Sequence, residues 1–163
     1  MASYSEKEIL SFLGQIPDPE IPVISIVELG VIRKIKASEA GVEIDITPTY
    51  SGCPAMKQME DDVRSTLKAK GLENITINMV YTPAWTTDWL SAEAREKLRK
   101  YGIAPPEESS TDKSFLTGKH KQVKCPRCGS LNTEMVSQFG STACKALYKC
   151  KDCLEPFDYF KCI

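Results

Sequence analysis

Two pairs of cysteines near the C-terminus most constrain how this chain can fold. Cys125 and Cys128 form one C-x2-C motif, Cys150 and Cys153 form a second, and 21 residues separate the two motifs. Two thiolates three residues apart on a tight turn can bind one cation, and two such turns together complete a closed tetrahedral site. A segment this short buries too little apolar surface to fold alone. We therefore predict a small zinc-ribbon-like domain whose metal ion forms its core.

The expected compartment favours metal ligation over disulfide formation. The N-terminal residues lack the basic start and the apolar run of a secretory signal, and no later stretch approaches the length needed to span a membrane. We therefore expect a cytoplasmic protein, in which thiols are kept reduced. Six of the seven cysteines follow residue 124, and this clustering favours a bound metal ion over disulfides or simple buried thiols.

Two further cysteines in the tail leave the ligand set open. Cys144 and Cys162 could each replace one of the four motif cysteines or join a separate cluster, because cages made only of sulfur also suit iron–sulfur centres. We interpret both as additional thiols that pack beside the site. We expect zinc in the tail, with iron in the same cage as the alternative.

Apolar periodicity predicts an α+β domain over residues 1–106, with a small three-stranded mixed sheet and two to three helices. The predicted elements are a helix between Ser5 and Pro17, a hairpin of strands 31–35 and 42–46, a helix from Pro54 to Gly71, a strand over 75–81, and a helix from Ser91 to Gly102. The third strand follows a helix, so it should lie parallel to the second. The polar segment 107–122 is interpreted as a linker, which leaves 123–163 as the zinc-ribbon-like domain.

The remaining cysteine, Cys53, lies apart from the tail cluster at the predicted start of a helix. The unpaired amides and the dipole of a helix N-terminus stabilise an anionic sulfur, so we predict that Cys53 is more thiolate than an ordinary cysteine. A small buried residue at a tight turn is the alternative of equal weight. Asp18 and Glu20 lie on a second loop made rigid by prolines. They could approach Cys53 as oxygen ligands or as acid and base groups, with solvated loop carboxylates as the alternative.

Three sequence segments resemble the MIP18-type iron–sulfur assembly family, also described as domain of unknown function 59. They are DPEIPVISIVELG at 18–30, TYSGCP at 49–54 and YTPAWTTDW at 81–89, and they occur in the order of the family. With FGSTACKALYKC at 139–150 and EPFDYF at 155–160, the whole chain resembles the D subunits of bacterial phenylacetyl-CoA epoxidase. The resemblance implies a MIP18-like first domain and a metal-binding ribbon after it.

The same resemblance implies a function and assigns roles to individual residues. It implies an accessory protein of aerobic phenylacetate degradation, which helps to mature the metal centres of a multicomponent oxygenase and is not itself an enzyme. Cys53 corresponds to the functional cysteine of the family. Candidate auxiliary residues are Asp18, Glu20 and Thr49. The expected cofactors are structural zinc and a transiently held iron ion or iron–sulfur cluster.

The resemblance also implies partners, namely the oxygenase and reductase components of the epoxidase. One thiolate cannot hold a cluster, so a second copy of the chain in a homodimer, or a cysteine of the client, would complete the coordination. A non-catalytic subunit that docks on the epoxidase and stabilises it is the alternative function. Nucleic-acid binding has little support because Lys and Arg (21) balance Asp and Glu (22). A stand-alone enzyme is disfavoured because the chain has no phosphate loop and only one histidine.

Overall fold

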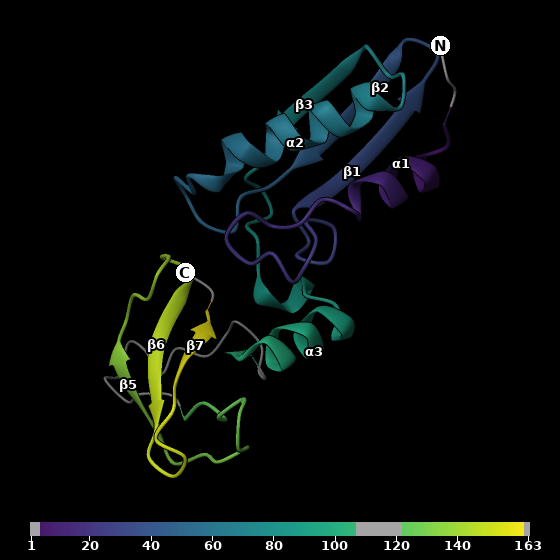
Figure 1. Ribbon diagram of the computed structural model, residues 1–163. Coiled ribbons are helices and arrows are strands. Elements are labelled where there is room, and N and C mark those ends of the chain that lie inside the picture. Colours follow the sequence, from purple (N-terminus) through teal and green to yellow (C-terminus); the bar gives the residue numbers. More distant parts are fainter. Residues whose placement is uncertain (1–3, 107–121, 162–163) are drawn as a thin grey trace. The chain divides into compact units, whose positions relative to one another are not determined.

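The computed structural model describes residues 4–106 and 122–161, which form two compact units (Figure 1). The units divide between Trp85 and Thr86. Cys162 and residues 107–121 of the predicted linker lie outside the described residues. Among the residues that are described, no helix is long and apolar enough to cross a membrane.

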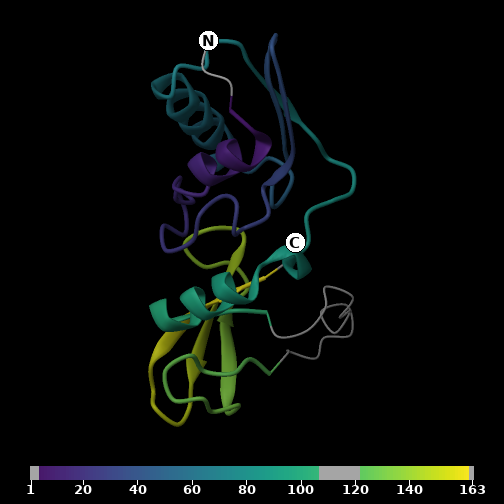
Figure 2. The same cartoon turned by 90° about the vertical axis from the view of Figure 1, so that its right-hand side faces the viewer.

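The N-terminal unit is a three-stranded sheet with two helices on one face (Figure 2). Its elements are helix α1 (Glu6–Leu13), strands β1 (Ile32–Ser38) and β2 (Gly41–Ile46), helix α2 (Ala55–Ala69) and strand β3 (Ile75–Met79). The strand order is β1-β2-β3, with β1 antiparallel and β3 parallel to β2. The predicted α+β class, the hairpin and the parallel third strand are therefore confirmed.

Local signals explain where these elements begin and turn. Ser5 starts α1 through a capping box, in which its hydroxyl accepts from the Glu8 N–H and the Glu8 carboxylate accepts from the Ser5 N–H at 2.8 Å. Gly41 opens β2 with a φ of 147°, and a side chain there would meet the Asn74 carbonyl oxygen at 2.5 Å. Glycine is required at this point because β2 approaches the backbone that leads into β3.

Alternation along β2 separates the core from the solvent-facing side of the sheet. Val42, Ile44 and Ile46 are buried, whereas Glu43 and Asp45 are partly exposed. Helices α1 and α2 cover the buried face with apolar side chains spaced one helical turn apart. Those side chains are Ile9 and Leu13 from α1 and Met59, Val63 and Leu67 from α2.

The C-terminal unit joins a helix to a four-stranded sheet. Its elements are the short helix η1 (Thr87–Trp89), helix α3 (Ala92–Tyr101) and strands β4 (Ile103–Ala104), β5 (Thr133–Ser137), β6 (Lys145–Cys150) and β7 (Pro156–Phe160). The strand order is β4-β7-β6-β5. The Ser91 hydroxyl caps α3 by accepting from the Ala94 N–H at 3.0 Å, and Gly102 ends it with a φ of 99°.

The division between units differs from the predicted boundary at 106. Residues 86–106 belong to the C-terminal unit, because β4 pairs in parallel with β7 and Ala104 is buried in the same apolar cluster as Val123 and Phe157. A strand of two residues carries no readable periodicity, and its partner lies more than fifty residues away along the chain. Both flanks of segment 107–121 therefore lie in one unit.

Candidate metal and thiol sites

The four motif cysteines form a cluster that can hold a metal ion. Their Sγ atoms all lie within 4.8 Å of one another, with 3.7 Å between Cys125 and Cys153 and 3.5 Å between Cys128 and Cys150. Tetrahedral zinc with Zn–S bonds of about 2.3 Å places the sulfur atoms about 3.8 Å apart. The cluster therefore has the donor set and the size of one closed tetrahedral site, without an open position for a substrate.

Two turns of the same backbone shape carry these cysteines, and we name them the first knuckle (125–130) and the second knuckle (150–155). In each turn the N–H of the first cysteine donates to the carbonyl oxygen five residues later, at 2.8 Å in the first and 3.0 Å in the second. The fifth residue of each turn is left-handed, with a φ of 79° at Gly129 and 64° at Leu154. Leu154 therefore adopts a conformation that a non-glycine residue rarely takes.

Asp152 ties the second knuckle to the first, a role that sequence analysis did not identify. Its carboxylate accepts from the Ser130 hydroxyl and from the Asn132 side-chain amide, the latter at 2.7 Å. These two hydrogen bonds, Ser130 first, hold the pKa of Asp152 below its usual value. The bonds fix the two turns relative to each other, which keeps the four sulfur atoms at ligand spacing.

The electrostatics of the cluster call for a cation. The backbone N–H of Cys153 is the main cause that lowers the pKa of Cys150 to about 7. The Glu155 N–H acts on Cys153 in the same direction, but burial and the three neighbouring sulfurs outweigh it and raise the pKa of Cys153 to about 12. Four adjacent sulfurs cannot all ionise against one another, and a bound dication removes that obstacle.

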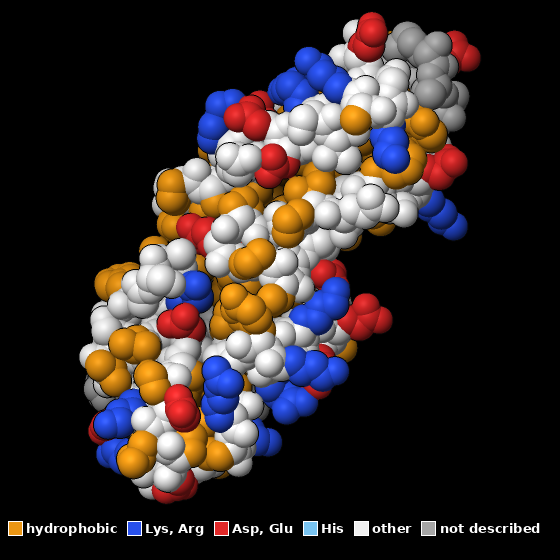
Figure 3. All heavy atoms as spheres, viewed as in Figure 1, with side chains coloured by type: hydrophobic (Ala, Val, Ile, Leu, Met, Phe, Trp, Pro, Cys, Tyr) orange, Lys and Arg blue, Asp and Glu red, His pale blue; other side chains and the backbone are white. Residues whose placement is uncertain are grey.

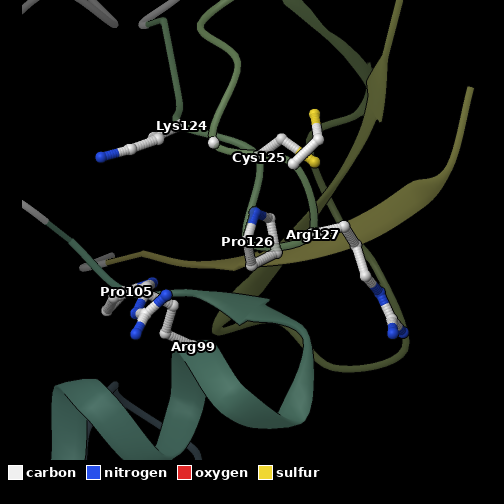
Figure 4. A pocket seen from close by; sticks show the side chains of 8 residues that line it. Arg99, Pro105, Lys124, Cys125, Pro126 and Arg127 are labelled. Carbon is white, nitrogen blue, oxygen red and sulfur yellow. The ribbon is translucent and has the colours of Figure 1, made fainter. Parts of the chain in front are cut away.

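A cavity of about 380 Å³ lies beside the first knuckle, with basic residues at its rim (Figure 4). Lys124 and Arg99 lie on one side of Pro126 and Arg127 lies on the other, and none of the residues that line the cavity is acidic. Four thiolates around one dication carry two negative charges in excess. Lys124 and Arg127 reduce the electrostatic cost of that excess, whereas Arg99 is paired with Glu96.

Cys144 lies apart from the cluster. It is buried directly before β6, whereas Cys150 of the cluster ends that strand, and six residues of extended chain span about 20 Å. The Thr142 hydroxyl contacts the Cys144 Sγ at 3.1 Å. This arrangement matches a packed additional thiol, while Cys162 falls outside the described residues.

Cys53 lies in the turn between β2 and α2, with 8% of its surface exposed. The Cys53 N–H donates to the Tyr50 carbonyl oxygen at 3.3 Å, which closes the turn. Pro54 caps α2 without a side-chain hydrogen bond. The Met56 N–H donates to the Cys53 carbonyl oxygen at 3.3 Å, and the Ala55 N–H donates to the Cys53 sulfur. The Tyr50 and Thr49 hydroxyls also hydrogen-bond the sulfur.

The prediction that Cys53 is unusually thiolate is wrong. Burial is the largest cause and raises the pKa of Cys53 above its ordinary value, and the negative charge of Glu20 adds to the rise. The hydrogen bonds from Ala55, Tyr50 and Thr49 lower the pKa without offsetting the burial. The turn reproduces the helix N-terminus that sequence analysis expected, but burial by residues distant in sequence decides the sign.

The two carboxylates of the acidic loop at 18–22, Asp18 and Glu20, have different roles. Asp18 is 3% exposed, and its Oδ1 accepts from the N–H groups of Glu20 at 2.9 Å and Ile21 at 2.6 Å. Asp18 therefore holds the loop in shape. Glu20 is half-buried and close enough to act on the charge of Cys53. The structure thus brings Glu20 and Thr49 to Cys53, and Tyr50 joins them.

Comparisons with known proteins match the two parts of the chain separately. Residues 6–79 match the family described as iron-sulfur cluster assembly protein, and residues 109–161 match the PaaD zinc beta ribbon domain. A crystal structure titled as domain of unknown function DUF59 from Bacillus anthracis superimposes with a TM-score of 0.54 at 30% identity. It covers 57% of this chain and 90% of that chain.

Two relatives extend these matches. An Fe-S protein maturation auxiliary factor of Porphyromonas gingivalis (strain ATCC BAA-308 / W83) is 33% identical over 58% of this chain and 90% of its own length. A protein of Escherichia coli (strain K12), named as a candidate D component of 1,2-phenylacetyl-CoA epoxidase, is 49% identical over 96% of this chain and 92% of its own length. The chain therefore belongs to the family of phenylacetyl-CoA epoxidase D components, with an iron–sulfur cluster assembly domain followed by a zinc β-ribbon domain.

Proposed function

We propose that this protein is an accessory maturation factor that assists insertion of iron or an iron–sulfur cluster into the multicomponent phenylacetyl-CoA epoxidase. One observation carries the proposal. Cys53 lies apart from the four-cysteine cluster, in the domain that matches the iron–sulfur assembly family, where Ala55, Tyr50 and Thr49 hydrogen-bond its sulfur. The names of the relatives, a maturation auxiliary factor and an epoxidase component, support the two halves of the proposal.

Cys53 in this role holds its cargo reversibly. A cation that binds the sulfur displaces the thiol proton to solvent, and the raised pKa of Cys53 makes that proton a stronger competitor at neutral pH. Glu20 supplies a carboxylate near the sulfur, which adds an oxygen ligand for iron. One thiol and one carboxylate leave most of the coordination shell to be completed by another molecule. Incomplete coordination suits handover to a client.

The ribbon in this role is structural. Cys125, Cys128, Cys150 and Cys153 hold one zinc ion, which supplies the folding free energy that the small β5–β7 sheet lacks. The donor set of four sulfurs is closed, so no position remains for substrate or water. The protein acts without catalysing the epoxidation.

The test measures metals in anaerobically purified protein and in its client. We expect Cys53→Ser to keep its zinc and its fold while epoxidase made in the same cells lacks its metal centre. Cys144→Ser is the matched control, because Cys144 is also a buried cysteine outside the cluster. Epoxidase fully loaded with metal beside Cys53→Ser would remove the proposed role of Cys53.

The second candidate function is a docking subunit of the epoxidase, and the surface of the C-terminal unit favours it. Five large apolar side chains of this unit are more than half exposed, and orange side chains gather over β5 in Figure 3. They are Tyr101, Leu131, Val136, Phe139 and Leu154. Exposed apolar groups of this kind commonly mark protein interfaces.

Stoichiometry separates the two functions. A docking subunit co-purifies with active epoxidase in equal amount and tolerates Cys53→Ser. A maturation factor associates only while the metal centres are being loaded, and it requires Cys53.

A further inference from the structure

The two edges of the N-terminal sheet differ in how they are protected against pairing with another strand. The β1 edge carries the exposed Arg33, Lys34 and Lys36 and an irregularity in its pairing between Ile32 and Lys34. Charges and bulges of this kind prevent edge-to-edge association. The β3 edge, Ile75–Met79, has no charged residue, no proline and no recorded bulge. It lies on the outside of the sheet in Figure 1.

The hydrogen-bond register shows which backbone groups β3 offers. Val42 donates to the Asn74 carbonyl oxygen at 2.9 Å, and Val80 donates to the Ile46 carbonyl oxygen at 2.8 Å. Residues 74, 76, 78 and 80 therefore pair with β2, and the backbone groups of 75, 77 and 79 face away from it. The Arg64 guanidinium donates a hydrogen bond to the Ile75 carbonyl oxygen at 3.0 Å. Within the described ranges, nothing hydrogen-bonds the outward groups of residues 77 and 79.

We propose that the β3 edge pairs with the β3 edge of a second copy of this chain, antiparallel and centred on Ile77, to form a six-stranded sheet across a two-fold axis. The outward N–H and C=O of Ile77 then exchange two hydrogen bonds with their counterparts. Residue 75 lies opposite residue 79, and Thr76 lies opposite Asn78.

The side chains of β3 are complementary to themselves in this arrangement. Ile75, Ile77 and Met79 share the face whose β2 partners are buried, so apolar residues meet apolar residues across the axis. Thr76 and Asn78 share the other face. The Asn78 amide nitrogen donates to Glu43 and Asp45 of β2, so the Asn78 side-chain oxygen is the group that can accept from the Thr76 hydroxyl of the second copy. No like charges oppose each other, as they would at the lysine-rich β1 edge. Self-complementarity identifies a second copy as the occupant.

The geometry also bears on how the coordination of Cys53 is completed, a step that rests on the proposed function. Cys53 follows the end of β2 at which Met79 lies. When two β3 strands pair antiparallel, their Met79 ends point in opposite directions. The two Met79 residues are then four residues, or about 13 Å, apart along the strands. Each Cys53 lies beyond its own Met79, so the two Cys53 residues are farther apart still. The second copy therefore does not supply the missing ligands, and the client must.

The test uses the full-length protein across a concentration series. An interface this small gives a weak dimer, with a dissociation constant between about 1 μM and 1 mM. We expect the sedimentation mass of the parent to rise toward the dimer over that range. Amide exchange at residues 77 and 79 should slow as the concentration rises. A parent that remains monomeric throughout, or whose residue 77 and 79 amides exchange equally fast at every concentration, overturns the proposal.

Two variants with matched controls locate the interface. Ile77→Pro removes an N–H that β2 does not use, so it should give a monomer, whereas Ile77→Val keeps the N–H and should dimerise. The double variant Thr76→Lys with Asn78→Lys places lysines opposite each other across the axis, so it should be monomeric. It tests the interface if the proline variant fails to fold. Gln58→Lys with Ser65→Lys adds the same charge on exposed positions of α2 and should dimerise. Dimerisation of the edge variants equal to that of the parent overturns the proposal.

A final variant keeps this inference distinct from the proposed function. Cys53→Ser should dimerise like the parent although it fails to support metal loading. Loss of metal loading without any dimer in the parent would leave the maturation role standing and remove the β3 interface. A dimer in the parent, together with normal metal loading by Cys53→Ser, would support the β3 interface and remove the proposed maturation role of Cys53.

Discussion

The four-cysteine cluster and Cys53 place the same side chain in two different environments. In the cluster each sulfur has three other sulfurs within 4.8 Å. Cys53 instead has hydroxyl and amide donors and one nearby carboxylate. The first environment favours a bound cation, whereas in the second burial favours the neutral thiol. Burial and neighbouring groups, more than the cysteine itself, therefore separate a cysteine suited to a shared metal site from one suited to the proposed exchange of cargo.

Removing the metal should have the largest effect and should act on one unit alone. Structural zinc contributes roughly 10–16 kcal/mol of apparent binding free energy in small zinc domains. A strong chelator should therefore unfold β5–β7, while β1–β3 keep their amide protection because the described residues of that unit form no cysteine cluster of this kind. Hydrogen exchange resolved by peptide measures both units in one sample. Equal loss of protection in both units, or none in the ribbon, would contradict the comparison.

The left-handed residues of the two knuckles give a smaller effect with opposite signs. Gly129→Ala should destabilise the ribbon by about 1–2 kcal/mol, since a side chain in this conformation is strained. Leu154→Gly should stabilise it by roughly 0.5–1 kcal/mol, because Leu154 bears that strain already and is 66% exposed, so little packing is lost.

Thermal unfolding of the zinc-loaded protein, followed by a signal from the ribbon, measures both knuckle variants. The β1–β3 unit in the same samples is the internal control. If both substitutions change the stability in the same direction, the left-handed conformation does not impose the same strain at residues 129 and 154, and the prediction is wrong.

The smallest effect concerns the charge beside Cys53. Because Glu20 raises the pKa of Cys53, Glu20→Gln should lower that pKa and increase the thiolate fraction at any fixed pH below it. Alkylation of Cys53 should therefore be faster at pH 8 in the variant, and its pH midpoint should move down from a parental value above that of an ordinary cysteine. Mass spectrometry of the peptide that contains Cys53 measures the rate.

Glu43→Gln is the control for this measurement, since Glu43 lies on the solvent-facing side of β2 and bonds to Asn78. Its alkylation profile should match the parent. A parental midpoint below that of an ordinary cysteine would mean that the helix N-terminus outweighs burial after all.

Local signals made most of the N-terminal fold predictable. The capping box of Ser5 and Glu8 and the apolar alternation in β2 act over a few residues, and the predicted helix and hairpin are present. Helix α1 ends at Leu13, before the predicted Pro17. Strand β4 could not be foreseen, because two residues carry no pattern and their pairing with β7 depends on the assembled ribbon.

The candidate sites divide in the same way. Spacing alone predicted that four cysteines would meet, because each pair is fixed by a short turn. The thiol state of Cys53 could not be predicted from its turn, since burial by distant residues sets the pKa. The hydrogen bonds from Ser130 and Asn132 to Asp152 also join residues some twenty positions apart, and no sequence motif indicates them.

The pairing of β4 with β7 has a consequence for cutting the chain. Because the residues on either side of segment 107–121 belong to one folded body, a break in that segment leaves two pieces that still share a sheet. A polypeptide that starts at residue 109, where the zinc ribbon match starts, lacks β4 and leaves β7 as an unpaired edge strand. The smallest piece that keeps the ribbon whole therefore begins upstream of α3.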